Sequence, residues 1–119
     1  MTVYADNAAT TQMSDSVLKA MMPLLTDIYG NPSSLHSVGQ IAKEHLEAAR
    51  ETVAECIGAD PKEIYFTSGG SEADNQAIRS AAYIGARKGK KHIISSKFEH
   101  HAVLHTLDAL KKEGFTVTL

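Results

Sequence analysis

A short apolar run passes through two adjacent glycines into a helical pattern between residues 64 and 82. Residues 64–67 form a run typical of a buried β-strand, and alanine and isoleucine recur at helical spacing after Gly69 and Gly70. A helix that opens on a glycine turn leaves its first backbone amides without acceptors, at the positive end of the helix dipole. The segment therefore predicts an anion-binding pocket, to which the Ser71 hydroxyl can contribute.

The same turn has a simpler interpretation. Ser71 and Asp74 stand in the register of a capping box, in which side chains close the first turn of a helix without any ligand. A tight turn followed by such a cap accounts for the segment as well as an anion pocket does. Both interpretations stay open at this point.

Strands and helices alternate along the second half of the chain. Three runs favour strands, at 64–67, 92–96 and 115–119, and two favour helices between them, at 72–88 and 101–112. This order predicts neighbouring parallel strands joined by right-handed crossovers, and hence the α/β fold class. Three strands are few for a sheet that must bury both faces, so we expect the front part of a larger domain. A complete three-stranded miniature is the competing interpretation.

The first half of the chain is expected to start with a short strand-like piece at 2–5, followed by two helices with a strong break between them. Ser14 is placed to cap a helix that continues to residue 28, and Pro23 should kink or interrupt it. The residues at 30–34, which include glycine, asparagine, proline and serine, predict a loop. An amphipathic pattern follows over 38–57 and should end at Gly58.

Charge and cysteine content limit the class of partner and compartment. The chain has 119 residues with 12 Lys and Arg against 14 Asp and Glu, interspersed, so nothing predicts nucleic-acid binding. It lacks both an 18-residue apolar span and a signal-peptide pattern, so we expect no membrane insertion. The single cysteine, Cys56, favours a reducing compartment, by default the cytoplasm. It lies on the apolar stripe of its helix, which predicts a buried core residue rather than a nucleophile.

A second loop whose residues could take part in catalysis or binding follows the strand expected at 92–96. It carries Glu99, His100 and His101. Loops that follow parallel strands open on the same edge of a sheet, so we expect these imidazoles near the glycine turn. An anion pocket beside an imidazole suits a planar, phosphorylated ligand. For any single histidine, a solvated loop that starts a helix is the alternative.

His101 and His105 raise a different possibility, because residues four apart share one side of a helix. Both imidazoles could bind one metal ion, with Glu99 or His100 nearby. The pattern is weak, since it offers two helical ligands and lacks both the His-Glu-x-x-His order and a cysteine pair. We keep a His-based metal-binding module as an alternative function and assign no metal ligand.

Four motifs occur in a fixed order along the chain. They are Asp6-Asn7-Ala8-Ala9-Thr10-Thr11, Gly30-Asn31-Pro32-Ser33-Ser34-Leu35-His36, Phe66-Thr67-Ser68-Gly69-Gly70-Ser71-Glu72-Ala73-Asp74-Asn75 and Glu99-His100-His101-Ala102-Val103-Leu104. Together they closely resemble the N-terminal third of the NifS/IscS-type cysteine desulfurases, which have the class V aminotransferase fold. The resemblance implies an N-terminal arm at 1–13. Residues 14–119 would then be the first, incomplete part of the large domain of a type I pyridoxal-phosphate transferase.

The resemblance also implies an activity and a set of site residues. The family uses pyridoxal phosphate to move sulfur from L-cysteine to an enzyme cysteine, giving alanine and a persulfide for iron–sulfur cluster or thiocofactor assembly. By resemblance, Gly70 and Ser71 hold the cofactor phosphate, and His100 stacks on the pyridine ring and assists proton transfer. Three residues of the arm would lie near the substrate: Asn7, Ala8 and Ala9.

Parts of the family's machinery are not found in this sequence. The Schiff-base lysine of the family follows a histidine, and this chain has no His-Lys pair. Cys56 does not match the family's persulfide cysteine, so we expect the chain alone to be inactive. Residues 31–36 match a segment near the active site of a dimer mate, which implies a homodimer or other self-association, with a sulfur-acceptor scaffold protein as a further partner. A non-catalytic interaction or oligomerising module derived from this fold is the alternative.

Overall fold

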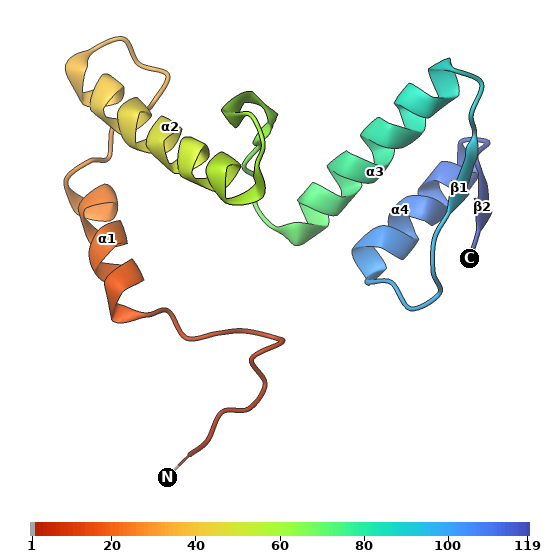
Figure 1. The fold of residues 1–119 in the computed structure, drawn as a ribbon, viewed down its shortest axis with the longest axis horizontal. Coiled ribbons are helices and arrows are strands. Elements are labelled where there is room, and N and C mark those ends of the chain that lie inside the picture. The colour runs from red at the N-terminus through yellow and green to blue at the C-terminus, as the bar shows by residue number, and fades with distance from the viewer. Residues whose placement is uncertain (1) are drawn as a thin grey trace. The chain divides into compact units, whose positions relative to one another are not determined.

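The computed structural model describes residues 2–119, and the chain divides into two compact units, Met1–Ile64 and Tyr65–Leu119 (Figure 1). The first unit contains α1 (Asp15–Thr26), α2 (Ser37–Ile57) and the short 3-10 helix η1 (Pro61–Glu63). The second contains α3 (Gly70–Arg87), β1 (His92–Ile94), α4 (His101–Lys112) and β2 (Thr116–Thr118). No helix within residues 2–119 is long and apolar enough to cross a membrane. The division into an arm at 1–13 and a domain at 14–119 stays a prediction.

Helix α1 begins as expected and continues past the expected interruption. The Ser14 hydroxyl accepts a hydrogen bond from the Val17 amide at 3.4 Å. The helix is continuous through Pro23 to Thr26, so the expected interruption is absent, although proline withholds one amide donor from the ladder. The Pro23 carbonyl itself accepts from the amides of Asp27 at 2.9 Å and Ile28 at 2.8 Å, which closes the end of the helix.

The loop before α2 packs closely on the first turn of that helix. A Cβ added at Gly39 would lie 2.6 Å from the Asn31 carbonyl oxygen and 2.6 Å from the Ser34 Cβ, so only glycine fits. His36 caps the helix, since its Nδ1 accepts from the Gly39 amide at 3.3 Å. The other end is closed as expected by Gly58, whose φ of 68° is the left-handed conformation that glycine adopts without strain.

Two expectations for the first unit are wrong. Cys56 is exposed rather than buried, because only Gly39, Ala42 and Ala54 of α2 are covered and the rest of its apolar stripe is open. Residues 2–5 form no strand, although their composition favours one, because they have no strand partner in the part of the chain that is described. Both features depend on neighbours that a local pattern does not contain.

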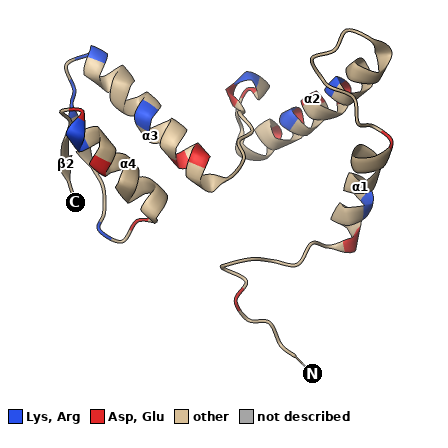
Figure 2. Cartoon of the chain, turned by 180° about the vertical axis from the view of Figure 1, so that it is seen from behind, with Lys and Arg blue, Asp and Glu red and all other residues tan. Residues whose placement is uncertain are grey.

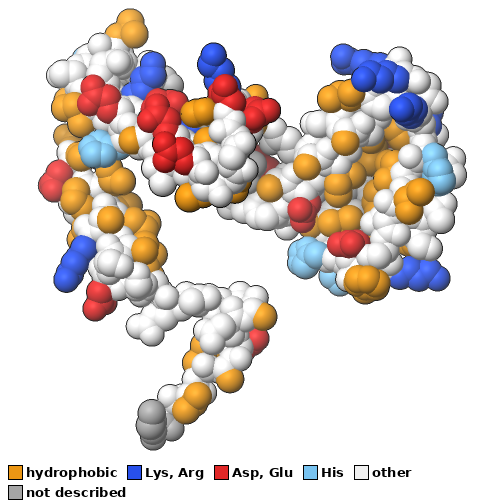
Figure 3. All heavy atoms as spheres, in the orientation of Figure 1, with side chains coloured by type: hydrophobic (Ala, Val, Ile, Leu, Met, Phe, Trp, Pro, Cys, Tyr) orange, Lys and Arg blue, Asp and Glu red, His pale blue; other side chains and the backbone are white. Residues whose placement is uncertain are grey.

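The second unit is a small α/β arrangement with a parallel sheet. β1 pairs with β2 in the register His92 to Thr116, Ile93 to Val117 and Ile94 to Thr118. The core consists of Ala82 from α3, Leu110 from α4 and Phe115, with Ile93 packed against it. Figure 3 shows apolar side chains gathered across the middle of this unit, and Figure 2 shows charges of both signs distributed over the chain.

The strand expected at 64–67 is not formed. Ile64 has extended torsion angles, with φ −91° and ψ 123°, yet the described residues provide no strand to pair with it, and the sheet has the order β1-β2. Tyr65 is 72% exposed as a result. The two remaining strands are three residues each, shorter than expected, whereas the helix expected at 101–112 is confirmed and the one expected at 72–88 spans Gly70–Arg87.

Candidate functional site

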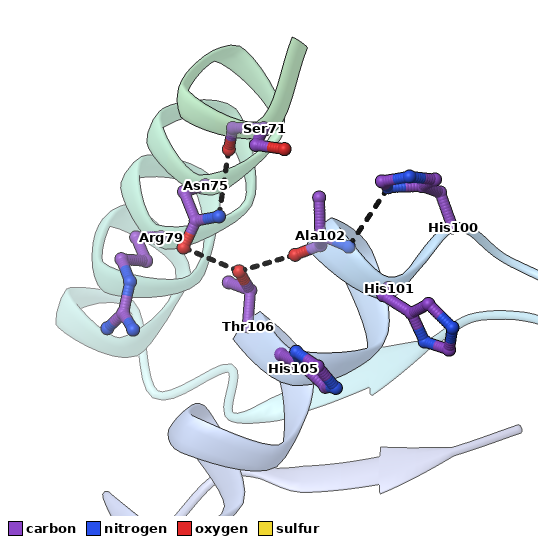
Figure 4. A pocket seen from close by; sticks show the side chains of 8 residues that line it. All are labelled: Ser71, Asn75, Arg79, His100, His101, Ala102, His105 and Thr106. Carbon is purple, nitrogen blue, oxygen red and sulfur yellow. Dashed lines mark hydrogen bonds between the residues drawn. The ribbon is translucent and has the colours of Figure 1, made fainter. Parts of the chain in front are cut away.

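A cavity of about 450 Å³ lies in the second unit, between the N-terminal halves of α3 and α4 (Figure 4). Helix α3 contributes one set of lining residues: Ser71, Asn75 and Arg79. The second set comes from the start of α4: His100, His101, Ala102, His105 and Thr106. The structure therefore brings the residues that follow the glycine turn and the histidine loop to one cavity, although only one of the two expected strands precedes them.

The start of α3 leaves free backbone donors next to open space. Gly70 and Ser71 are the first two residues of the helix, so their amides have no acceptor within it. A Cβ added at Gly69 or Gly70 would meet no atom within 4 Å. The backbone of Gly69 is extended, with φ 167°, so its conformation does not require glycine. Open space over these positions is what the approach of a ligand to the backbone needs.

The expected capping box between Ser71 and Asp74 is not formed. The helix begins at Gly70, so Ser71 lies inside the first turn, and the N-cap residue Gly69 makes no side-chain hydrogen bond. Glu72 closes the turn instead, because its Oε2 accepts from the Ser68 amide at 2.7 Å and from the Ser68 hydroxyl at 2.6 Å. These two hydrogen bonds hold the pKa of Glu72 below its usual value.

His100 is both the N-cap of α4 and a lining residue of the cavity. Its Nδ1 accepts a hydrogen bond from the Ala102 amide at 3.1 Å. Because a neutral imidazole has one donor and one acceptor nitrogen, this contact assigns the proton to Nε2. The solvated helix start considered as the alternative is thus present, and it coexists with a place in the cavity wall.

Asn75 and Thr106 join the two helices beside the cavity, and sequence reasoning missed both. The Asn75 Nδ2 donates to the Ser71 carbonyl at 2.8 Å, and the Thr106 hydroxyl lies 2.6 Å from Asn75 Oδ1 and 2.8 Å from the Ala102 carbonyl. Thr106 is only 2% exposed. A hydroxyl within an otherwise apolar helix face was the available signal.

Arg79 adds a cation to the cavity wall. Its guanidinium lies 3.4 Å from the Tyr83 hydroxyl and 3.2 Å from Glu113 Oε1. These partners raise the pKa of Arg79 further, the hydrogen bond to Tyr83 most and Glu113 next. The ion pair with Glu113 compensates part of the positive charge that Arg79 presents to the cavity.

The histidine pair considered as a metal site lies in the cavity wall. His101 and His105 stack, with ring centroids 5.4 Å apart and planes 25° apart. No group of three or more His, Cys, Asp or Glu within residues 2–119 could hold a metal ion, so the metal-binding alternative gains no support.

The proposed substrate residues Asn7, Ala8 and Ala9 form an exposed turn of the first unit, which the Ala9 amide closes by donating to the Asp6 carbonyl at 3.1 Å.

Comparison with known proteins gives consistent matches. Cysteine desulfurase IscS of Methanosarcina thermophila is 50% identical over 116 residues, which are 98% of this chain and 28% of that protein. A solved NifS-like protein matches with a TM-score of 0.92 and 43% sequence identity. The match covers 99% of this chain and 32% of the chain of that protein. The solved structure of SspA in complex with cysteine matches with a TM-score of 0.83 and 40% sequence identity. That match covers 93% of this chain and 32% of the SspA chain.

The chain thus spans less than a third of the length of these relatives. The family model described as aminotransferase class V matches residues 3–119, nearly the whole chain. The chain therefore belongs to the aminotransferase class V family.

Proposed function

We propose that the protein carrying this chain is a cysteine desulfurase, and that the chain is the N-terminal portion of its cofactor-binding domain. One observation carries the proposal: Ser71, which follows the open glycine turn, and His100 line the same cavity. Family membership and relatives named cysteine desulfurase support it. Cytoplasmic localisation remains a prediction.

The residues around the cavity fit pyridoxal phosphate. The open amides at Gly70 and Ser71 would hold the phosphate at the positive end of α3. The imidazole of His100, which lines the same cavity, would contact the pyridine ring. When bound, the cofactor supplies an electron sink for breaking bonds of an amino acid. The part of this chain is to bind and orient it.

The substrate proposed for the intact enzyme is L-cysteine. Its sulfur would pass to an enzyme cysteine as a persulfide, leaving alanine, and then to a sulfur-acceptor scaffold protein for iron–sulfur cluster or thiocofactor assembly. The solved relative SspA, which is in complex with cysteine, supports this substrate. Because the chain has no His-Lys pair, and Cys56 does not match the family's persulfide cysteine, we propose that these 119 residues alone have no desulfurase activity.

Equilibrium dialysis with two ligands tests the proposal on this chain. Pyridoxal phosphate and pyridoxal differ only in the phosphate that the start of α3 would hold. We expect the chain to retain pyridoxal phosphate and to release pyridoxal, with alanine production from L-cysteine undetectable. Equal retention of both ligands, or of neither, would contradict the proposed phosphate site.

An interaction module is the second candidate, and α1 favours it. No residue of this helix is buried, and its apolar side chains are between 38% and 65% exposed. These are Val17, Leu18, Met21, Met22, Leu24 and Leu25. A contiguous exposed apolar face marks an interaction surface. Light scattering would favour this candidate if the chain forms a defined oligomer and binds no pyridoxal phosphate.

A further inference from the structure

We propose that Asn75 and Thr106 are a positioning pair, which fixes the first turn of α3 against the imidazole of His100. The inference rests on the proposed function, because it concerns how two ligand contacts are spaced. Neither side chain needs to touch the ligand in this role. The pair acts through the groups that it holds, the Ser71 backbone on one side and the N-cap of α4 on the other.

The Asn75 amide links the two helices in one orientation. The Ser71 carbonyl can only accept, so it requires the Nδ2 of Asn75, which lies 2.8 Å away. This leaves Oδ1 to accept from Thr106 of α4, at 2.6 Å and 31 residues further along the chain. Rotating the amide would set two acceptors against each other at Ser71, so the contacts themselves fix its orientation.

Thr106 extends the connection to His100. Its hydroxyl has a single proton and lies within reach of both Asn75 Oδ1 and the Ala102 carbonyl, where water has little access, since the residue is 2% exposed. The Ala102 amide in turn donates to His100 Nδ1. Four contacts within hydrogen-bond distance thus run from the Ser71 carbonyl to the imidazole ring, and Asn75 Oδ1 and the Ala102 carbonyl share the single Thr106 proton, as the dashed lines of Figure 4 show.

A comparison within the chain separates this role from ordinary helix chemistry. Thr52 of α2 makes the same hydrogen bond to the carbonyl four residues earlier, at 2.9 Å, but its side chain is exposed to solvent. The core contact of Ala82 with Leu110 already holds α3 and α4 together. What Asn75 and Thr106 add is therefore the local spacing at the end that carries the cavity.

The spacing should matter only to a ligand that makes both contacts. Inorganic phosphate would engage the start of α3 alone, whereas pyridoxal phosphate would also engage His100. We expect Thr106→Val to weaken pyridoxal phosphate binding by about tenfold, the scale of one lost hydrogen bond, and to leave inorganic phosphate binding unchanged. Thr106→Ser, which keeps the hydroxyl, should restore the affinity.

The experiment compares these variants with Thr52→Val, which removes a matched hydroxyl in the first unit. Dissociation constants for pyridoxal phosphate and inorganic phosphate are measured by NMR titration of the full chain. Asn75→Ala provides a second route to the same loss if Thr106→Val does not fold. Three results would each overturn the positioning role: an equal loss of affinity for both ligands in Thr106→Val, unchanged affinity for pyridoxal phosphate in that variant, or failure of Thr106→Ser to restore that affinity.

A ligand-free measurement keeps this inference separate from the proposed function. In the Thr106→Val variant, the Ser71 carbonyl carbon and the His100 ring nitrogens should both change their NMR shifts, and in Thr52→Val neither should. If the native chain binds no pyridoxal phosphate, the proposed function fails. The NMR shifts of the ligand-free variants still test whether Asn75 and Thr106 connect Ser71 to His100. Unchanged shifts at Ser71 and His100 would overturn it.

Discussion

Substitution of Gly70 should separate the stability of α3 from its ability to hold a phosphate. Gly70 is the first residue of the helix and is not among the glycines with positive φ. A Cβ added there meets no atom within 4 Å, so alanine fits the free chain without strain. The same methyl group would occupy space that a ligand needs in order to approach the backbone amides.

The two effects of Gly70→Ala have opposite signs. Replacing a glycine at a position that alanine can adopt raises the free energy of unfolding by about 0.4–1 kcal/mol, chiefly through the unfolded state. For a small domain this corresponds to a melting temperature about 2–8 °C higher. A phosphate that loses one charge-assisted hydrogen bond loses about 1.5–3 kcal/mol, so pyridoxal phosphate should bind about ten- to a hundredfold more weakly.

Thermal melting followed by circular dichroism and equilibrium dialysis with pyridoxal phosphate measure the two effects. Gly58→Ala is the matched control, because that position also has open space around it but requires a φ of 68°. It should lower stability by about 1 kcal/mol and leave binding unchanged. Native-like binding by Gly70→Ala would refute the phosphate site at the start of α3, and a lower melting temperature would refute the assumption of open space.

Three further substitutions or conditions test the fold. Leu110→Ala should lower the free energy of unfolding, measured by urea titration, by about 2–5 kcal/mol, because Leu110 is 0% exposed in the core. The control Leu35→Ala, at a side chain 94% exposed, should change that free energy by less than about 0.5 kcal/mol. Gly39→Ala should be destabilising by about 1–3 kcal/mol, since its methyl group would overlap the preceding loop, and a neutral result would contradict that close packing. Glu72 has a lowered pKa, so its hydrogen bonds to Ser68 stabilise the folded chain above the usual carboxyl pKa and are lost as the pH falls through the folded value; a carbon-13 NMR titration midpoint at or above 4.5 would contradict this.

Local signals in the sequence predicted local structure well. The cap at Ser14 and the left-handed end at Gly58 each depend on a few neighbouring residues, and both are confirmed. The helix at 101–112 and the parallel pairing of the strands that flank it are confirmed for the same reason, because period and order along the chain determine them. The meeting of Ser71 and His100 at one cavity was also expected, although the strand at 64–67 on which that expectation partly rested is not formed.

Features that depend on distant neighbours were not predictable. Residues 64–67 have the composition of a strand, but a strand exists only when another pairs with it. Burial of Cys56 required coverage that the described residues do not provide. The contact of Asn75 with Thr106 joins residues 31 positions apart, and no pattern in either helix specifies it. These failures share one cause, which is that pairing and burial belong to the assembled fold.

The cap that His100 places on α4 leaves one of its two ring nitrogens free for other contacts. With its Nδ1 lone pair committed to the Ala102 amide, the neutral ring keeps its proton on Nε2, and that N–H can donate a hydrogen bond. A proton on Nδ1 would remove this acceptor, and the first turn of α4 would keep its backbone hydrogen bonds from Val103 and Leu104 to the His100 carbonyl. The same side chain thus closes the start of a helix and lines the cavity.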